Sequence, residues 1–190
     1  MTTTKIIFVR HGRTNYNEKG LMDYQNKAQL TGIGRDQAKK IAEIFSDENI
    51  NAIYSSPLDR CIDTITPLAK SKGLEITKIN DLIEVNSPDL QNKTFSCKNY
   101  KWDNGYGGGE KISEVFSRVK KVIENLLEKH KGETIVICAH GDITFLGRLY
   151  FHSELNYDTD KYTCEKYLEN NPEKYDISAM YGVEIVDVEK

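Results

Sequence analysis

Apolar residues along the chain gather into short runs, and two of these runs are continuous. Residues Ile6–Val9 and Ile135–Ala139 are apolar throughout and rich in β-branched side chains. A strand of this kind needs cover on both of its faces, as in the parallel sheet of an α/β protein. Shorter runs predict further strands at 51–54, 75–79 and 183–188, and the alternating run at 75–79 is typical of a sheet edge.

Between these runs, apolar residues recur at the spacing of amphipathic helices. The clearest case is the apolar stripe from Ile112 to Leu127. Further helices are predicted from Leu30-Thr31-Gly32 through Phe45, from Ser56-Pro57 onward, and over 142–151. Ser56 is the expected cap of its helix, with the proline at the first helical position. The alternation of strands and helices predicts an α/β sandwich around a mostly parallel central sheet.

Three polar segments interrupt this pattern. Residues 15–29 predict a loop, and the stretches at about 84–109 and 152–180 predict excursions from the domain. Irregular segments of such length are uncommon in compact domains unless they serve a function or are disordered. The chain has 190 residues, enough for a substantial core, and contains no internal repeat and no clear linker. We therefore predict a single domain over residues 1–190.

Charge and cysteine content narrow the class of protein. The formal net charge of −3 argues against nucleic acid as a partner. No apolar run approaches the length of a membrane span, and residues 1–5 lead into the first strand without a signal-peptide core. The four cysteines are scattered without a Cys-x-x-Cys pair, which predicts free thiols, with Cys138 buried, and a cytoplasmic protein. A homodimer is compatible with the sequence, through an edge strand or the tyrosine-rich second excursion.

The residues that carry chemistry stand where predicted strands end. Arg10-His11-Gly12 follows the first apolar run, His140-Gly141 follows the second, and Arg60 lies in the first helical turn after the strand at 51–54. Gly12 allows the chain to turn where a side chain would clash. Ligands of open α/β sheets bind at the carboxyl ends of the strands. Guanidinium groups and helix N-termini both attract phosphate oxygens, so this grouping predicts a phosphate pocket. Two nearby arginines disfavour protonation of His11, and a neutral imidazole can act as a nucleophile.

Several blocks of the sequence resemble the histidine phosphatase superfamily, the phosphoglycerate mutase-like proteins. Five blocks occur in the order expected for that family: Val9–Asn17, Leu30–Gly34, Tyr54–Thr64, Gly108–Glu110 with Arg118, and Val136–Gly141. The resemblance covers most of the chain. It implies a three-layer α/β/α sandwich of the phosphoglycerate mutase-like kind.

The resemblance also implies a catalytic set. His11 would attack the phosphoryl group and become phosphohistidine, with His140 stabilising charge in the transition state. Glu84, at the position of the family's acid, would protonate the leaving oxygen and then activate water. The expected function is that of a metal-independent phosphomonoester hydrolase without a cofactor, acting on a small phosphorylated metabolite.

A second set of residues is expected to bind the phosphate oxygens. It comprises Arg10, Asn17, Arg60, His140 and Gly141, of which the two arginines supply the positive charge that a metal would otherwise provide.

The chain departs from the family pattern around the rim of the pocket. Tyr24, Lys27 and Gln29 stand where the family has Gly, Asp and Pro, and the flank of Glu84 lacks the usual glycines and tryptophan. These departures bear on specificity more than on phosphoryl chemistry. An anionic substrate is favoured by the basic rim residues Arg13, Lys27, Lys93 and Lys98.

Two other functions fit the same residues. A phosphoglycerate mutase would return the phosphoryl group to the substrate, but the family's mutases have longer chains, so the length favours a phosphatase. A catalytically weak module that binds a phosphorylated ligand would result if Glu84 were misplaced. Asn17 also reads as a simple turn residue, and Glu110 as an early-turn acid that favours the helix dipole.

Overall fold

The described part of the chain, residues 3–24, 26–94, 106–151 and 183–189 of a computed structural model, is built on one sheet of five strands. The strands follow the order β3-β2-β4-β1-β5. All neighbours pair in parallel except β5, which runs antiparallel to β1. The mostly parallel sheet is thus confirmed, and so is the edge position of the 75–79 strand. The strands are β1 (Thr3–Arg10), β2 (Ala52–Ser55), β3 (Ile76–Lys78), β4 (Thr134–Ala139) and β5 (Val183–Glu189).

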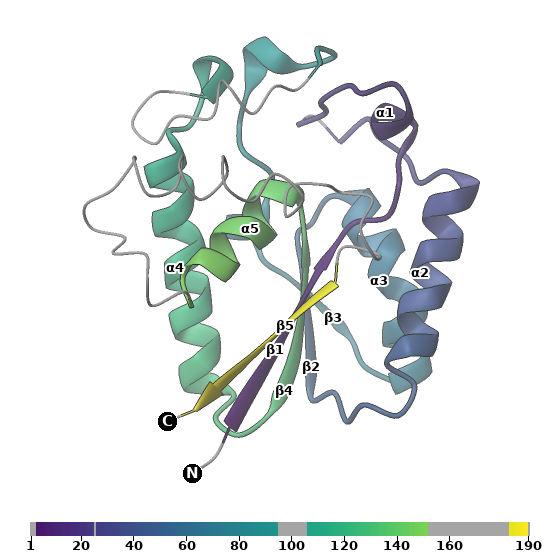
Figure 1. The fold of residues 1–190 in the computed structure, drawn as a ribbon, viewed down its shortest axis with the longest axis vertical. Coiled ribbons are helices and arrows are strands. Elements are labelled where there is room, and N and C mark those ends of the chain that lie inside the picture. The colour runs from purple at the N-terminus through teal and green to yellow at the C-terminus, as the bar shows by residue number, and fades with distance from the viewer. Residues whose placement is uncertain (1–2, 25, 95–105, 152–182, 190) are drawn as a thin grey trace.

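Helices cover both faces of this sheet (Figure 1). Helices α2 (Gly32–Ile44) and α3 (Asp59–Lys72) lie on one face, and α4 (Ile112–Lys129) and α5 (Gly141–Leu149) lie on the other. The predicted α/β/α sandwich is therefore present. The short helix α1 (Asn15–Glu18) lies beyond the carboxyl end of β1.

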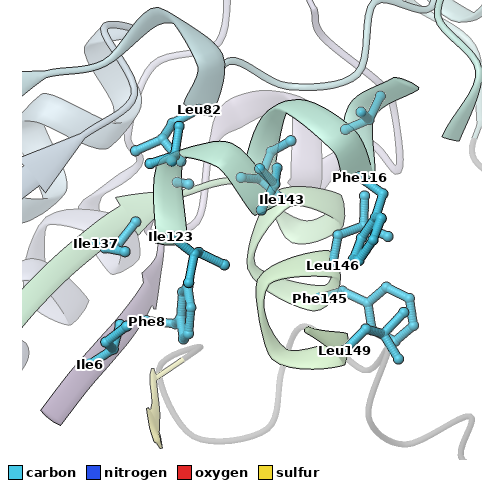
Figure 2. Packing of buried hydrophobic residues seen from close by; sticks show 14 of the residues in the cluster. Ile6, Phe8, Leu82, Phe116, Ile123, Ile137, Ile143, Phe145, Leu146 and Leu149 are labelled. Carbon is cyan, nitrogen blue, oxygen red and sulfur yellow. The ribbon is translucent and has the colours of Figure 1, made fainter. Parts of the chain in front are cut away.

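Side chains that alternate along the strands fill a separate apolar core on each face of the sheet. Ile6 and Phe8 of β1 pack with α4 and α5 (Figure 2), whereas Ile7 and Val9 pack with α2 and α3. Every apolar side chain of the predicted stripe from 112 to 127 is buried, so that stripe is core. Burial of one such side chain contributes about 1.5–3 kcal/mol. The two cores hold the strands, and with them the residues at the strand ends, in a fixed register.

Some element boundaries differ from the sequence prediction. Residues 15–18 form α1 where a loop was predicted, because Thr14 and Asn17 cap the helix reciprocally. Helix α3 begins at Asp59 and not at Ser56-Pro57, and its N-cap Leu58 makes no side-chain cap bond. The cap comes instead from a distant segment, since Asn26 Oδ1 accepts the backbone N–H of Asp59 at 2.9 Å.

Part of the first predicted excursion, at 84–109, can be described. Residues 84–94 and 106–109 contain two 3₁₀ turns, η2 (Pro88–Leu90) and η4 (Tyr106–Gly108), and η1 (Asn80–Leu82) precedes them. The predicted excursion at 152–180 lies outside the described residues, as do Cys97 and Cys164. Cys61 and Cys138 are free, buried thiols, in agreement with the prediction for Cys138. None of the described helices combines the length and the apolar character that crossing a bilayer requires.

Candidate active site

The register of the parallel strands brings three chain segments to one edge of the sheet. The backbone N–H of His11, directly after β1, donates to the carbonyl of Ala139 at 3.0 Å. The N–H of Ser56, directly after β2, donates to the carbonyl of Cys138 at 2.9 Å. His140 follows β4 and is the N-cap residue of α5. The strand-end residues therefore meet at the carboxyl edge, as the sequence predicts.

His11 is buried and its tautomer is set by the backbone. Its side-chain Nδ1 lies 2.9 Å from the carbonyl oxygen of Gly12, and because a carbonyl can only accept, the proton is on Nδ1. Nε2 of the neutral ring then carries the free lone pair. Burial, followed by the charges of Arg60 and Arg10, holds the pKa of His11 well below its usual range, against a smaller opposing effect of the Gly12 bond. The effect of the two arginines was predicted from the sequence, whereas burial, the larger cause, was not.

Gly12 is required by a close approach between two backbone segments. A Cβ at this position would lie 2.6 Å from the carbonyl oxygen of Gly34 in α2, which confirms the predicted clash. The Gly12 N–H donates to Thr64 Oγ1 at 2.8 Å, and the same hydroxyl donates to the carbonyl of Arg60 at 2.6 Å. The turn that presents His11 is thereby tied to α3.

His140 is fully buried beside His11. The two rings meet edge to face with their centroids 5.4 Å apart. A hydrogen bond of 2.8 Å joins His140 Nε2 to Ser56 Oγ. Burial is the first cause, and the charge of Arg60 the second, that hold the pKa of His140 well below its usual range. The second histidine is therefore also neutral near pH 7.

Glu84 faces this histidine from the segment between η1 and η2. Its Oε2 lies 4.0 Å from His140 Nδ1, and its side chain is 12% exposed. Its Oε1 accepts the N–H of Val85 at 3.0 Å. Burial and the negative charge of the buried Asp142, at the start of α5, raise the pKa of Glu84 to about 7, although Arg60 and Arg10 oppose the shift. A substantial fraction of this carboxyl group is therefore protonated near neutral pH.

The two arginines are held in different ways. The side chain of Arg60 is 3% exposed, and its Nη1 lies 3.3 Å from Asp23 Oδ2. Its Nη2 donates to the carbonyl oxygen of Asp23 at 2.9 Å. Arg10 lies against the first residue of α5, where a Cβ on Gly141 would come within 3.2 Å of the guanidinium carbon. Gly141 thus lets the guanidinium group of Arg10 approach the N-terminus of α5, which favours anions.

Two residues have local partners that the sequence did not indicate. Asn17 Oδ1 accepts from the N–H of Thr14 at 3.1 Å and from its hydroxyl at 3.0 Å, so its predicted contact with phosphate stays a prediction. Glu110 lies before α4, and its Oε1 lies 3.0 Å from Arg118 Nε. The prediction of Glu110 as an early-turn helix acid is therefore wrong, because α4 begins at Ile112 and the acid of its first turn is Glu114.

Sequence reasoning missed several side chains around the site. Ser56 was expected to cap a helix, whereas its hydroxyl bonds to His140. Asp142 directly follows His140-Gly141, and this position was a usable signal for a residue beside the pocket. Asp23 lies in a polar stretch without periodicity, where nothing in the sequence marks it. Within the described ranges, no group of three or more His, Cys, Asp or Glu side chains is placed to hold a metal ion.

Comparison with known proteins identifies the family. Residues 6–155 match the family model described as the histidine phosphatase superfamily (branch 1). The chain belongs to the histidine phosphatase superfamily. This confirms the family and the fold that the sequence blocks predicted.

Named members of this superfamily are similar to the chain over most of its length. It is 32% identical over 155 residues to a phosphoglycerate mutase-like protein 4 of Arabidopsis thaliana, covering 73% of this chain and 67% of the relative. It is also 32% identical to a metal-independent phosphoserine phosphatase of the same plant, covering 74% of this chain and 65% of the relative. The chain thus spans about two thirds of the length of these two relatives.

A solved structure supports the same fold. A mycobacterial glucosyl-3-phosphoglycerate phosphatase in complex with VO₃ superposes with a TM-score of 0.71 at 25% identity, covering 77% of this chain and 79% of that structure. The histidine phosphatase fold therefore accounts for the described sheet and its flanking helices.

Proposed function

We propose that the chain is a metal-independent phosphomonoesterase that hydrolyses a small phosphorylated metabolite through a phosphohistidine. The observation that carries this proposal is the state of His11. Its ring is buried, neutral and oriented by the Gly12 carbonyl, and Arg60 and Arg10 lie close enough to lower its pKa. A phosphoryl group held by those arginines would meet the free lone pair of Nε2.

In the first step, Nε2 of His11 forms a bond to phosphorus while the bond from phosphorus to the leaving oxygen breaks. The leaving oxygen takes a proton from the carboxylic acid of Glu84, which becomes a carboxylate. A carboxyl group whose pKa is about 7 suits this task, because it holds the proton near neutral pH and yields it readily.

In the second step, water attacks the phosphohistidine. The Glu84 carboxylate accepts a proton from this water, the bond between phosphorus and Nε2 breaks, and inorganic phosphate leaves. Both His11 and Glu84 return to their starting states, so the cycle balances without a metal or cofactor.

The transferring phosphoryl group requires positive charge and hydrogen-bond donors around its oxygens. Arg10 and Arg60 supply the charge from two different elements, β1 and α3. The backbone at Gly141, the ring of His140 and the amide of Asn17 complete the predicted set. Oxygens developing negative charge would find these donors already in place.

Phosphatase-named relatives support hydrolysis of a small phosphorylated metabolite, and they favour it over the mutase alternative. Arg13, Lys27 and Lys93 have exposed side chains that would attract an anionic substrate body, while Lys98 lies outside the described residues. Phosphoserine and phosphorylated sugar acids are therefore the first compounds for a substrate panel. Buried free thiols at Cys61 and Cys138 suit a reducing compartment, which supports the proposal of a cytoplasmic location. A homodimer stays a prediction.

The decisive experiment measures phosphate release from p-nitrophenyl phosphate in EDTA, with His11→Ala beside the wild type. Turnover should survive the chelator and fall below detection in His11→Ala. The matched control is His130→Asn, which changes a buried histidine that bonds to Tyr54 Oη and not to the site. Its turnover should stay near that of the wild type.

Two outcomes would replace the proposal. Formation of 2-phosphoglycerate from 3-phosphoglycerate in the presence of 2,3-bisphosphoglycerate, without net phosphate release, would establish a mutase. Binding of inorganic phosphate without turnover of any panel substrate would establish a phospho-ligand-binding module.

A further inference from the structure

Asp23 is a buried carboxylate in the segment where the chain departs from the family pattern. Its side chain is only 2% exposed, although the surrounding sequence is polar and was predicted to be a loop. A buried carboxylate is costly unless its oxygens are paired and hydrogen-bonded. The partners of Asp23 therefore indicate what the residue is for.

The Asp23 carboxylate has donors on both oxygens. Oδ2 accepts the backbone N–H groups of Lys27 at 2.8 Å and Ala28 at 2.7 Å, and Nη1 of Arg60 lies 3.3 Å away. Oδ1 accepts from Gln91 Nε2 at 3.1 Å. The position of the carboxylate is thus fixed by donors other than the arginine.

Asp23 holds Arg60 at two points. Its carboxylate bonds to Nη1, and its backbone carbonyl accepts from Nη2. A guanidinium group carries five N–H donors in a rigid plane, so two contacts from one residue fix that plane and leave other donors for phosphate oxygens. An arginine without this support would have to be ordered at the moment of substrate binding, at a cost in entropy.

The same residue also connects Arg60 to the acid-bearing loop. Gln91 belongs to the segment that follows Glu84, and its Oε1 accepts the N–H of Tyr24 at 3.1 Å while its Nε2 donates to Asp23. The bridges Leu21 to Thr94 and Met22 to Gln91 join the two segments further. Asp23 therefore lies between a phosphate-binding arginine and the loop that carries the acid.

We propose that Asp23 is a positioning residue, which orients the guanidinium group of Arg60 for phosphate. The inference rests on the proposed function, because Arg60 is taken as a phosphate ligand there. It assigns a task to one residue of the divergent segment at 23–29: the carboxylate and the backbone carbonyl of Asp23 support the guanidinium group of Arg60.

The neighbouring Asn26 offers a matched control. Its amide makes reciprocal bonds with Asp59, through Nδ2 to Asp59 Oδ2 at 3.0 Å and through Oδ1 to the Asp59 N–H. It therefore clamps the same helical turn of α3 without contacting Arg60. Asn26 has a φ of 59°, which glycine adopts without strain, so Asn26→Gly removes the clamp and keeps the backbone.

The test is a double-mutant cycle with Asp23→Asn, Arg60→Lys and the combined variant, in the full chain. Asparagine keeps the shape of the side chain but removes the charge. We expect Asp23→Asn to lower kcat/KM about 100-fold, the size of effect that misplacement of a substrate-positioning group produces. The inhibition constant for inorganic phosphate should rise in the same variant. Asn26→Gly should lower the melting temperature but leave both constants near those of the wild type.

The cycle separates positioning from a structural role. If Asp23 acts through Arg60, adding Asp23→Asn to Arg60→Lys should change kcat/KM and the phosphate inhibition constant by less than about twofold. Independent, multiplicative losses in the double variant, or a loss in Asn26→Gly equal to that in Asp23→Asn, would overturn the inference. If the wild type lacks turnover, the proposed function fails, and calorimetric phosphate binding in the same four proteins still tests the coupling of Asp23 to Arg60.

Discussion

The rings of His11 and His140 meet edge to face at a centroid separation of 5.4 Å and an interplanar angle of 62°. Burial and the nearby arginines hold the pKa of both rings well below the usual range, so neither is charged near pH 7. Two neutral rings can lie this close without repulsion. In the proposed mechanism His11 attacks phosphorus and His140 forms a hydrogen bond to an oxygen of the same phosphoryl group. The orientation of His140 then depends on its bond to Ser56.

Ser56→Ala should therefore impair turnover by freeing the His140 ring. The variant loses the 2.8 Å bond to Nε2 and leaves a buried polar group without that partner, which costs about 1–3 kcal/mol. We expect kcat to fall about tenfold, equivalent to about 1.4 kcal/mol in the barrier. Ser55→Ala is the matched control, since Ser55 is equally buried but donates to the carbonyl of Ser56. Equal losses of kcat in the two variants would contradict a specific role of the Ser56 hydroxyl.

Glu84→Gln should remove the basic limb of the pH profile. Because burial and Asp142 raise the pKa of Glu84 to about 7, the acid is protonated below that pH and loses its proton above it. Wild-type kcat/KM for an alkyl phosphate should thus fall as the pH rises through about 7. Glutamine cannot donate this proton, and we expect a loss of at least about 100-fold. p-Nitrophenyl phosphate, whose leaving group needs little protonation, should lose much less. An equal loss for both substrates would show that Glu84 is not the acid.

Asp142→Asn should move that limb toward lower pH. The negative charge of Asp142 is the second cause, after burial, of the raised pKa of Glu84. Without this charge, Glu84 loses its proton more readily, so the fall in kcat/KM should begin at a lower pH while the acidic side of the profile is unchanged. The measurement is kcat/KM for an alkyl phosphate across the neutral range. A limb that stays in place would mean that the charge of Asp142 does not contribute to the raised pKa of Glu84.

The parts of the fold that were predictable are those that burial dictates. A continuous apolar run such as 135–139 must be covered on both faces, and the stripe from 112 to 127 must face a core, so period and composition suffice to assign them. The sites of His11 and His140 follow from topology, because the ends of neighbouring parallel strands meet. The sequence therefore predicted that these two histidines lie close together, and their ring centroids are 5.4 Å apart.

The supports of the site could not be predicted in this way. Asp23 and Asn26 lie in a loop with no hydrophobic periodicity. Their partners in α3 are far away in the sequence, since Asp23 and Arg60 are 37 residues apart and Asn26 and Asp59 are 33 apart. Their bonds are specific to polar side chains, so neither propensity nor burial indicates them. The proton affinity of Glu84 likewise depends on Asp142, a residue brought close by a different element.

Gly12→Ala should destabilise the protein and impair the site together. The added Cβ would lie 2.6 Å from the backbone oxygen of Gly34, so the turn that orients His11 has to shift. Overpacking of this kind costs about 1–3 kcal/mol in the free energy of unfolding. Gly32→Ala is the control, since nothing lies within 4 Å of its Cβ at the start of α2, and it should stabilise by about 0.4–1 kcal/mol. Urea unfolding measures both, and a Gly12→Ala protein as stable as the wild type would refute the close approach.

Arg118 should matter to catalysis through the loop that carries Glu84. Its Nε and Nη2 donate to the two oxygens of Glu110, at 3.0 and 3.1 Å, and its Nη1 donates to the carbonyl of Asp81. Glu110 in turn accepts the N–H of Asn86 at 2.9 Å. The pair therefore holds the chain on both sides of Glu84. We expect Arg118→Met to lower kcat for alkyl phosphates about tenfold, because an acid displaced by a fraction of an ångström transfers its proton poorly.

The same substitution should have no further effect when Glu84 has already been changed. If Arg118 acts only by placing the Glu84 carboxyl group, Arg118→Met in the Glu84→Gln background removes support from a residue that no longer donates a proton, and kcat should stay as it is. Lys121→Met, on an exposed position of α4, controls for the loss of a positive charge from this helix. Steady-state kinetics of the four proteins decide the matter. A tenfold loss in both backgrounds would assign Arg118 to the stability of α4 or to the field around His140, whose pKa it also lowers, and not to the placement of Glu84.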